Sequence, residues 1–210
     1  MRALRTLAIA LPLLLSTGAA QATTVLQVDV QEAATLSDWV VEVRVVNVAS
    51  VDLRAEGKGL FTDVTLSIRD VFKGENVPAT YVMRLVGGEG KDGLALMVPG
   101  MPVFSAGERA VLFLEKTNIG HVPCGLGQGV WRVHQSNASQ PWVEQSIHGL
   151  HMMSRDEAGN LRTVEPESAS SGMPLLRLLE EIYAALDQPA PAPAPPALAP
   201  AKATLPQAAP

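Results

Sequence analysis

The stretch RAVLFLE at residues 109–115 decides the fold, because its five central residues are all apolar and lie between two charged ones. A short apolar run bounded by turn signals is typical of a strand that is buried on both faces. Gly107 and Glu108 precede the run, and the turn-like sequence TNIG follows it at residues 117–120. We therefore predict that residues 109–115 form the central strand of a β-barrel or β-sandwich.

Apolar patterns on both sides of this stretch predict further strands. We expect them at residues 23–30, 39–48, 60–72, 80–86, 94–98 and 129–134, with another hairpin at residues 142–144 and 146–153. In residues 39–48 the apolar phase moves by one residue between Val45 and Val46, which predicts a β-bulge; burial of both faces would give the same pattern. The glycine-rich residues 87–93 predict a mobile loop. Strands of this length and spacing indicate an all-β sandwich or barrel.

Two segments have helical patterns. Residues 31–38 predict a short helix with Ala33, Ala34 and Leu36 facing inward. Residues 174–187 predict an amphipathic helix, in which Pro174 suits the first turn. The apolar residues at helical spacing are Leu175, Leu178, Leu179, Ile182, Tyr183 and Leu186. We expect this face to pack on the β-core, and recruitment of a partner protein is the alternative.

Residues 1–22 have the pattern of a secretory signal peptide. Two arginines precede an apolar run at residues 7–15, and the small-residue sequence AQA follows at residues 20–22. This run is too short to span a bilayer, which needs about 20 apolar residues. We expect cleavage before Thr23 and export of the chain to the periplasm or the extracellular space, with a retained membrane anchor as the alternative.

The remaining chain divides by composition into four parts. We predict a β-barrel domain at residues 23–153, a polar linker at 154–173, the amphipathic helix at 174–187 and a disordered Pro/Ala-rich tail at 188–210. The net charge of −5 becomes more negative once the two arginines of the signal peptide are removed. A mildly acidic chain lacks the basic footprint of a nucleic-acid-binding protein. No segment after the signal peptide is long and apolar enough to be a transmembrane helix.

Four residues have types and spacings that suit chemistry. His121 and Cys124 form an HxxC pair, and His148 and His151 form an HxxH pair; both spacings resemble those of zinc ligands. The alternative is that the histidines are surface or half-buried groups and that the thiol is a small buried apolar group. A thiol nucleophile at Cys124 with His121 as its base has the right residue types, but no motif with a known mechanism surrounds them. We assign no catalytic, cofactor-binding or metal-binding residue and expect no cofactor.

Several segments, in order, resemble a family of uncharacterised exported bacterial proteins. They are WVVEVRVVNV at residues 39–48, TDVTLSIRDVFKG at 62–74, YVMRLVGG at 81–88, VPGMPVFSAGERAVLFLE at 98–115 and GLGQGVWRV at 125–133. The resemblance covers residues 28–133 and implies an OB-like barrel, similar to the netrin-like domain of tissue inhibitors of metalloproteinases. In those inhibitors an N-terminal cysteine chelates the zinc of the protease. Thr23 stands at the expected mature N-terminus of this chain, so the resemblance carries over the fold and not that chemistry.

These observations together predict a mainly β protein. We expect an OB-like closed or partly open β-barrel with a short N-terminal helix and a C-terminal amphipathic helix. The expected function is that of an exported, non-enzymatic binding module whose partner is an exported protein, such as a protease, or a component of the cell envelope. The first alternative is a partner or inhibitor of an exported metalloprotease. The second is a small metal- or thiol-dependent enzyme that uses His121, Cys124, His148 and His151.

Overall fold

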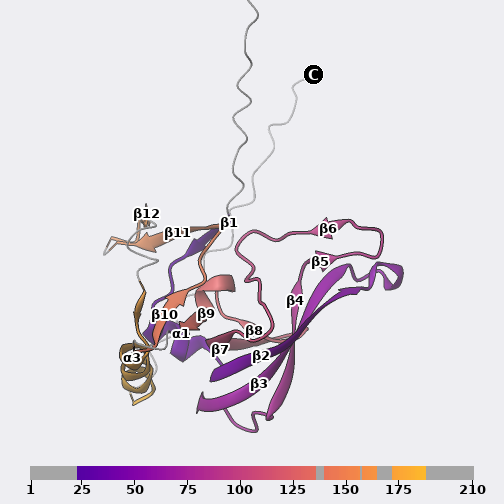
Figure 1. The fold of residues 1–210 in the computed structure, drawn as a ribbon. Coiled ribbons are helices and arrows are strands. Elements are labelled where there is room, and N and C mark those ends of the chain that lie inside the picture. The colour runs from indigo at the N-terminus through magenta and orange to yellow at the C-terminus, as the bar shows by residue number, and fades with distance from the viewer. Residues whose placement is uncertain (1–22, 136–139, 157, 165–171, 188–210) are drawn as a thin grey trace, which may run out of the picture.

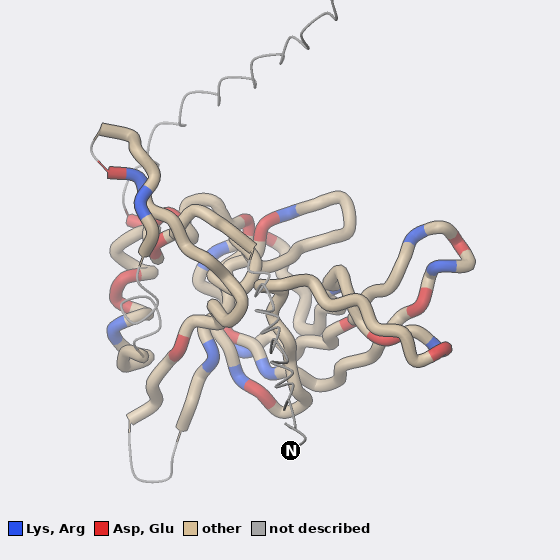
Figure 2. Tube along the Cα trace, turned by 90° about the horizontal axis from the view of Figure 1, so that it is seen from above, with Lys and Arg blue, Asp and Glu red and all other residues tan. Residues whose placement is uncertain are grey.

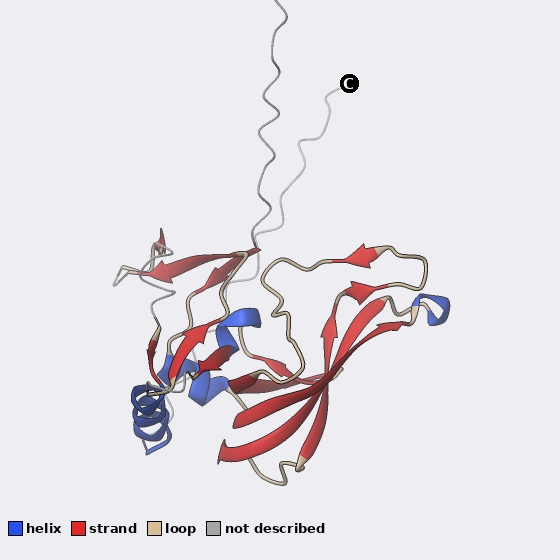
Figure 3. Cartoon of the chain, viewed as in Figure 1, coloured by secondary structure: helices blue, strands red, loops and turns tan. Residues whose placement is uncertain are grey.

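The structure is a computed structural model that describes residues 23–135, 140–156, 158–164 and 172–187 (Figure 1). The predicted signal peptide at residues 1–22 and the predicted disordered tail at residues 188–210 lie outside the described residues. Within the described part of the chain the protein is mainly β with two α-helices, which confirms that part of the predicted fold class (Figure 3).

One antiparallel sheet of eight strands forms the framework, in the order β13-β10-β9-β7-β2-β3-β4, with β8 paired to β7. Its strands are β2 (Trp39–Asp52), β3 (Leu60–Lys73), β4 (Thr80–Val86), β7 (Arg109–Thr117), β8 (Gly120–Pro123), β9 (Val130–His134), β10 (Trp142–Gln145) and β13 (Met173–Pro174). The predicted strands at residues 39–48, 60–72, 80–86, 109–115 and 129–134 are therefore all present, with small differences in their bounds.

Smaller elements complete the fold. In a second sheet β1 (Thr23–Leu26) runs parallel to β11 (Leu150–Arg155), which also pairs with β12 (Leu161–Thr163). A third sheet has only β5 (Gly88–Glu89) and β6 (Ala95–Leu96). The helices are α1 (Val30–Leu36) and α3 (Leu175–Asp187), and the short 3-10 helices are η1 (Arg54–Glu56) and η2 (Leu126–Gly129).

Strand β7 is buried on both faces, as predicted. Val111 and Phe113 belong to a core cluster that lies between the sheet and the two helices. Ala110, Leu112 and Leu114 belong to a second cluster, which fills the concave side formed with β2, β3 and β4. All five side chains are at most 1% exposed. The continuous apolar run thus supplies two separate cores at once, and this is why it shows no alternation.

The predicted bulge in β2 is confirmed. The register against β3 shifts between Val45 and Asn47, so that Val46 has no partner there and its side chain is 56% exposed. Before the shift Val45 faces the concave core, and after it Val48 does. The extra residue bends the strand and lets the same sheet face stay apolar along its length.

Helices α1 and α3 pack on each other and cover the outer face of the sheet (Figure 1). The side chain of Asp29 caps α1 by accepting a hydrogen bond from the backbone N–H of Glu32 at 2.8 Å. Ala33 and Ala34 face inward as predicted, but the prediction for Leu36 is wrong, since it is 55% exposed. Ser37 lies four residues after Ala33 and is buried with it, whereas Leu36 lies two residues after Ala34, more than half a turn away from that residue.

Helix α3 buries most of the face that the sequence predicts, but Ala185 is buried and Tyr183 is not. Its buried residues are Leu175, Leu178, Ile182 and Ala185. Leu179 and Leu186 are partly buried against the same cluster, whereas Tyr183 is 55% exposed and only its ring edge meets Phe72, at 6.0 Å between centroids.

The sheet does not close into a barrel. Among the described residues no backbone ladder joins β4 to β8, although these are the edges that would have to pair. The two edges are instead linked through one side chain: the backbone N–H of His121 donates to the Tyr81 hydroxyl at 2.6 Å, and that hydroxyl donates to the His121 carbonyl oxygen at 3.3 Å. The sequence predicts an OB-like barrel, closed or partly open, and the closed form is not present among the described residues.

Other predicted elements also differ from the structure. The expected strand at residues 94–98 is reduced to β6, because Pro99 follows at once and Gly100 turns the chain with a φ of 81°. Residues 142–144 and 146–153 do not form a hairpin, since β10 pairs with β9 and β13 while β11 pairs with β1 and β12. The range 154–173, expected as a polar linker, contains β12 and the first residue of β13.

Candidate functional site

An apolar groove lies at one end of the sheet, where β2, β3 and β4 meet the segments that follow β4. Its volume is about 680 Å³. We call residues 87–96, which contain β5 and β6, the hairpin, and residues 97–104 the strap. The sheet contributes Val48, Val64 and Leu85 to the lining, and the strap contributes Met97, Pro102 and Phe104. In Figure 1 the hairpin and the strap run above the ends of these strands.

The hairpin and the strap leave large apolar side chains in solvent. Met97 is 86% exposed, Val103 is 78% exposed and Leu94 is 64% exposed. Met97 and Val103 also line the groove, and exposed apolar residues at a groove are typical of a binding site. Figure 2 shows Lys and Arg interspersed with Asp and Glu along the described chain. The strap itself contains no charged residue.

The charged side chains that line the groove are paired or exposed. The Arg132 guanidinium donates to Glu108 at 2.8 Å, to the Val103 carbonyl oxygen at 2.6 Å and to the Ser146 hydroxyl at 3.2 Å. It also lies over the Phe104 ring, 5.6 Å from its centroid. Glu89, at the rim, is exposed to solvent. The groove therefore presents an apolar interior without an unpaired buried charge among its described lining.

The middle of the strap is fixed to elements from distant parts of the chain. The Thr23 hydroxyl donates to the Pro99 carbonyl oxygen at 2.9 Å, and the Gly127 N–H donates to the Gly100 carbonyl oxygen at 3.0 Å. A side chain at Gly100 would collide with Leu150. Glycine at this position thus allows the strap to pass close to β11, which places it over the groove.

The four residues with candidate chemistry do not share one site. His121 stacks on Trp39 at 3.7 Å between ring centroids, beside Tyr81. Cys124 is buried in the core cluster under the helices. His148 lines the groove, and His151 is exposed on β11. No group of three or more His, Cys, Asp or Glu residues in the described ranges is arranged to hold a metal ion.

The surroundings of His121 and Cys124 do not suit catalysis. Burial lowers the pKa of His121, and the nearby charge of Asp38 offsets this in part. Burial, together with the nearby charges of Glu115 and Glu32, raises the pKa of the Cys124 thiol to about 11. An activated cysteine has a lowered pKa and an accessible sulfur atom. Cys124 has neither, so the structure gives it the role of a small apolar core residue.

The sequence does not predict the groove. The sequence predicts only that the apolar residues 94–98 form a strand, whereas most of their side chains face the groove or the solvent. The usable signal is the pair Pro99 and Pro102 within an uncharged run, because two prolines so close together rule out a regular strand.

None of the helices in the described residues has the length and the apolar character needed to cross a bilayer. Comparisons of the chain with family models, with curated proteins and with solved structures found no match in any of the three cases.

Proposed function

We propose that the protein is an exported, non-enzymatic binding protein that holds the acyl chain of a cell-envelope lipid in the groove. The observation that carries the proposal is the groove itself, which has a volume of about 680 Å³ and is lined mainly by apolar side chains. Small-molecule sites typically have volumes of about 300–1,000 Å³ and an apolar lining with few polar groups. The sequence of residues 1–22 supports export, which would bring the groove into contact with envelope lipids.

An acyl chain fits the chemistry of the groove better than an extended peptide does. A peptide that adds to a sheet edge needs free backbone N–H and C=O groups in a regular row. Pro99 and Pro102 remove two N–H donors from the strap, and β5 and β6 are only two residues long. An acyl chain needs no hydrogen bonds, and Met97 and Met101 provide flexible surfaces that adapt to it.

We also propose that the framework is a partly open OB-like barrel. The contact of Tyr81 with both backbone groups of His121 supports this, because it brings the free edges of β4 and β8 together. The strand order along β8, β7, β2, β3 and β4 is consistent with such a barrel. The groove would then occupy one open end of the barrel, beneath the strap.

The binding proposal is tested with the neutral fluorescent probe N-phenyl-1-naphthylamine and with monoacylglycerols of increasing chain length as competitors. Each methylene transferred from water into the groove is worth about 0.8 kcal/mol. Four added methylenes, from octanoyl to dodecanoyl, should therefore strengthen competition by up to roughly two-hundredfold. An uncharged apolar hexapeptide is tested as a competitor beside the monoacylglycerols. Competition by the peptide without any dependence on acyl-chain length would contradict the proposal.

A matched pair of variants locates the site. Met101→Asp places a carboxylate at a partly buried position of the groove lining and should weaken probe binding about tenfold or more, because a charge is costly to desolvate. Leu176→Asp makes the same kind of change at a side chain that is 64% exposed on α3, away from the groove, and should bind the probe like the wild type. Equal loss in both variants would show that the probe does not bind in the groove.

The other two predicted functions stay proposals with weaker support. A role as partner or inhibitor of an exported metalloprotease rests on the resemblance to the netrin-like inhibitors, and a titration against such proteases tests it. An enzyme that uses His121, Cys124, His148 and His151 would need groups that the structure leaves in different places, as described above.

A further inference from the structure

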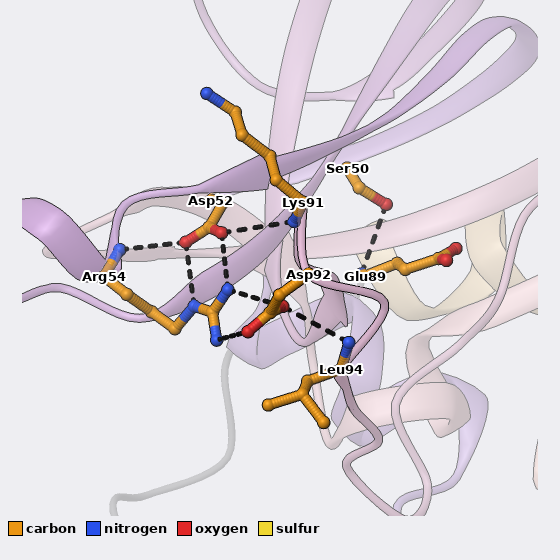
Figure 4. Close-up of polar contacts among 7 residues, drawn as sticks. All are labelled: Ser50, Asp52, Arg54, Glu89, Lys91, Asp92 and Leu94. Carbon is orange, nitrogen blue, oxygen red and sulfur yellow. Dashed lines mark hydrogen bonds and ion pairs between the residues drawn. The ribbon is translucent and has the colours of Figure 1, made fainter.

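The turn of the hairpin that forms one wall of the groove is held chiefly by one side chain, Arg54, at the start of η1. Its Nε and Nη2 atoms donate to the two carboxylate oxygens of Asp52 at 2.9 and 2.7 Å. Its Nη1 and Nη2 atoms donate to the two carboxylate oxygens of Asp92, at the turn of the hairpin, at 3.0 and 2.8 Å (Figure 4). We call these three residues the Arg54 clamp. The guanidinium is planar and has five donors, so it can bind two carboxylates side by side.

The clamp also orders the backbone of the hairpin. The Lys91 N–H donates to Asp52 at 3.4 Å, and the Leu94 N–H donates to Asp92 at 3.3 Å (Figure 4). Hydrogen bonds from Arg54 hold the pKa values of both Asp52 and Asp92 below the usual range. Both carboxyl groups are therefore ionised at neutral pH, and the charges needed for the clamp are present.

The hairpin has little else to hold its turn in place. The β5–β6 ladder pairs only two residues on each strand. An isolated two-stranded hairpin is marginally stable even when it is longer than this. At its base the Gly87 N–H donates to the Leu60 carbonyl oxygen at 2.9 Å, and the Thr62 hydroxyl donates to the Gly87 carbonyl oxygen at 2.9 Å. The base is thus tied to β3, and β5 is tied to β2 because the Glu89 N–H donates to the Ser50 hydroxyl at 3.3 Å, while the position of the turn depends on the clamp.

We propose that Arg54 is a positioning residue that sets the width of the groove by fixing the hairpin over the ends of β2 and β3. This inference rests on the proposed function of the groove. Arg54 does not itself line the groove, whereas Gly87, Gly88, Glu89, Ala95 and Leu96 of the hairpin do. When the clamp is released, the hairpin samples positions in which the wall is displaced. Part of the binding free energy is then used to close the wall, so the apparent affinity of the ligand falls in proportion to the fraction of molecules in which the wall is already closed.

The test compares two arginines of equal exposure. Arg54→Met removes the clamp, and Arg84→Met removes the bidentate pair of Arg84 with Asp63, which joins β4 to β3 away from the groove. The two arginine side chains are 38% and 37% exposed. Exposed ion pairs are individually weak, so we expect N-phenyl-1-naphthylamine to bind Arg54→Met about three- to tenfold more weakly, through faster dissociation. Arg84→Met should keep the wild-type dissociation rate.

Two further variants separate positioning from loss of charge. Gly90→Ala changes no charge, but its methyl group would displace the guanidinium, since an added Cβ collides with Nη2 of Arg54. It should therefore speed probe dissociation as Arg54→Met does. Arg54→Lys keeps the charge without the bidentate geometry and should give an intermediate rate.

Hydrogen exchange of the hairpin amides measures directly whether the clamp holds the hairpin, independently of probe binding. Faster exchange at residues 88–96 in Arg54→Met, with faster probe dissociation and an unchanged Tm, supports the proposal. Faster exchange with an unchanged dissociation rate overturns it, because the wall would then move without effect on the groove. Unchanged exchange also overturns it. If the wild-type protein binds no probe, the proposed function fails, and the exchange data still report whether Arg54 holds the hairpin.

Discussion

Strand β7 offers a direct test of the two-core arrangement. Phe113 faces the helices and Leu112 faces the concave side of the sheet, and both side chains are completely buried. Replacing a fully buried phenylalanine with alanine costs about 3–5 kcal/mol, and replacing leucine costs about 2–5 kcal/mol. The free energy of unfolding of a typical domain is about 5–15 kcal/mol. Phe113→Ala and Leu112→Ala should therefore each remove a large share of the free energy of unfolding.

The free energies of unfolding are measured by urea titration, followed by the fluorescence of the three tryptophans. Lys116→Ala is the control on the same strand, because its side chain is exposed and the change should fall within about 0.5 kcal/mol of the wild type. If either buried variant also unfolds within about 0.5 kcal/mol of the wild type, one face of β7 is not packed, and the account of two cores is wrong.

Three further predictions concern single residues. Burial lowers the pKa of His121, so the unfolded chain binds a proton more readily than the folded chain, and stability should fall as the pH drops below about 7, through the unfolded value of about 6.5. His121→Phe keeps a ring on Trp39 and should flatten the slope of Tm between pH 7 and 5. An unchanged slope would contradict this prediction. Cys124 is 4% exposed and its pKa is raised to about 11, so at pH 8 it should react with a disulfide reagent slowly in the native protein and at once in urea; rapid native reaction would refute its burial. Gly127→Ala should lower the free energy of unfolding by more than about 2 kcal/mol in urea titrations, because the added methyl group would overlap the backbone carbonyl oxygen of Ser146. A free energy of unfolding equal to that of the wild type would mean that η2 lies elsewhere.

Much of the framework follows from local patterns. The run at residues 110–114 has no alternation, and that alone indicates burial on both faces of β7. The phase change at Val46 predicts the bulge of β2, because side-chain direction along a strand has a period of two. The leucine spacing in α3 predicts its buried face, and the Arg177–Glu181 pair forms at 3.1 Å as its spacing suggests.

The groove and its clamp depend on contacts that no local pattern contains. Arg54 and Asp92 are 38 residues apart, and nothing near either one indicates the other as its partner. The composition of residues 94–98 resembles that of a core strand, and their exposure results from the path of the chain after Pro99. Leu36 is a smaller case, since the buried face of α1 continues from Ala33 to Ser37, so that Leu36 faces the solvent although it is apolar. Strand patterns likewise do not predict whether a barrel closes, because the pairing of its edge strands depends on the bend of the whole sheet.

The placement of β1 has a consequence for how the chain acquires its structure. Its four residues pair with β11, and Gln128 binds Leu26 and Val28 across 102 and 100 residues of sequence. A ribosome delivers this strand early, yet its partners are synthesised much later, so the contact order of this corner is high and its assembly is slow. Strand β1 would thus be among the last of the described elements to find its native neighbours, although it is synthesised before all of them.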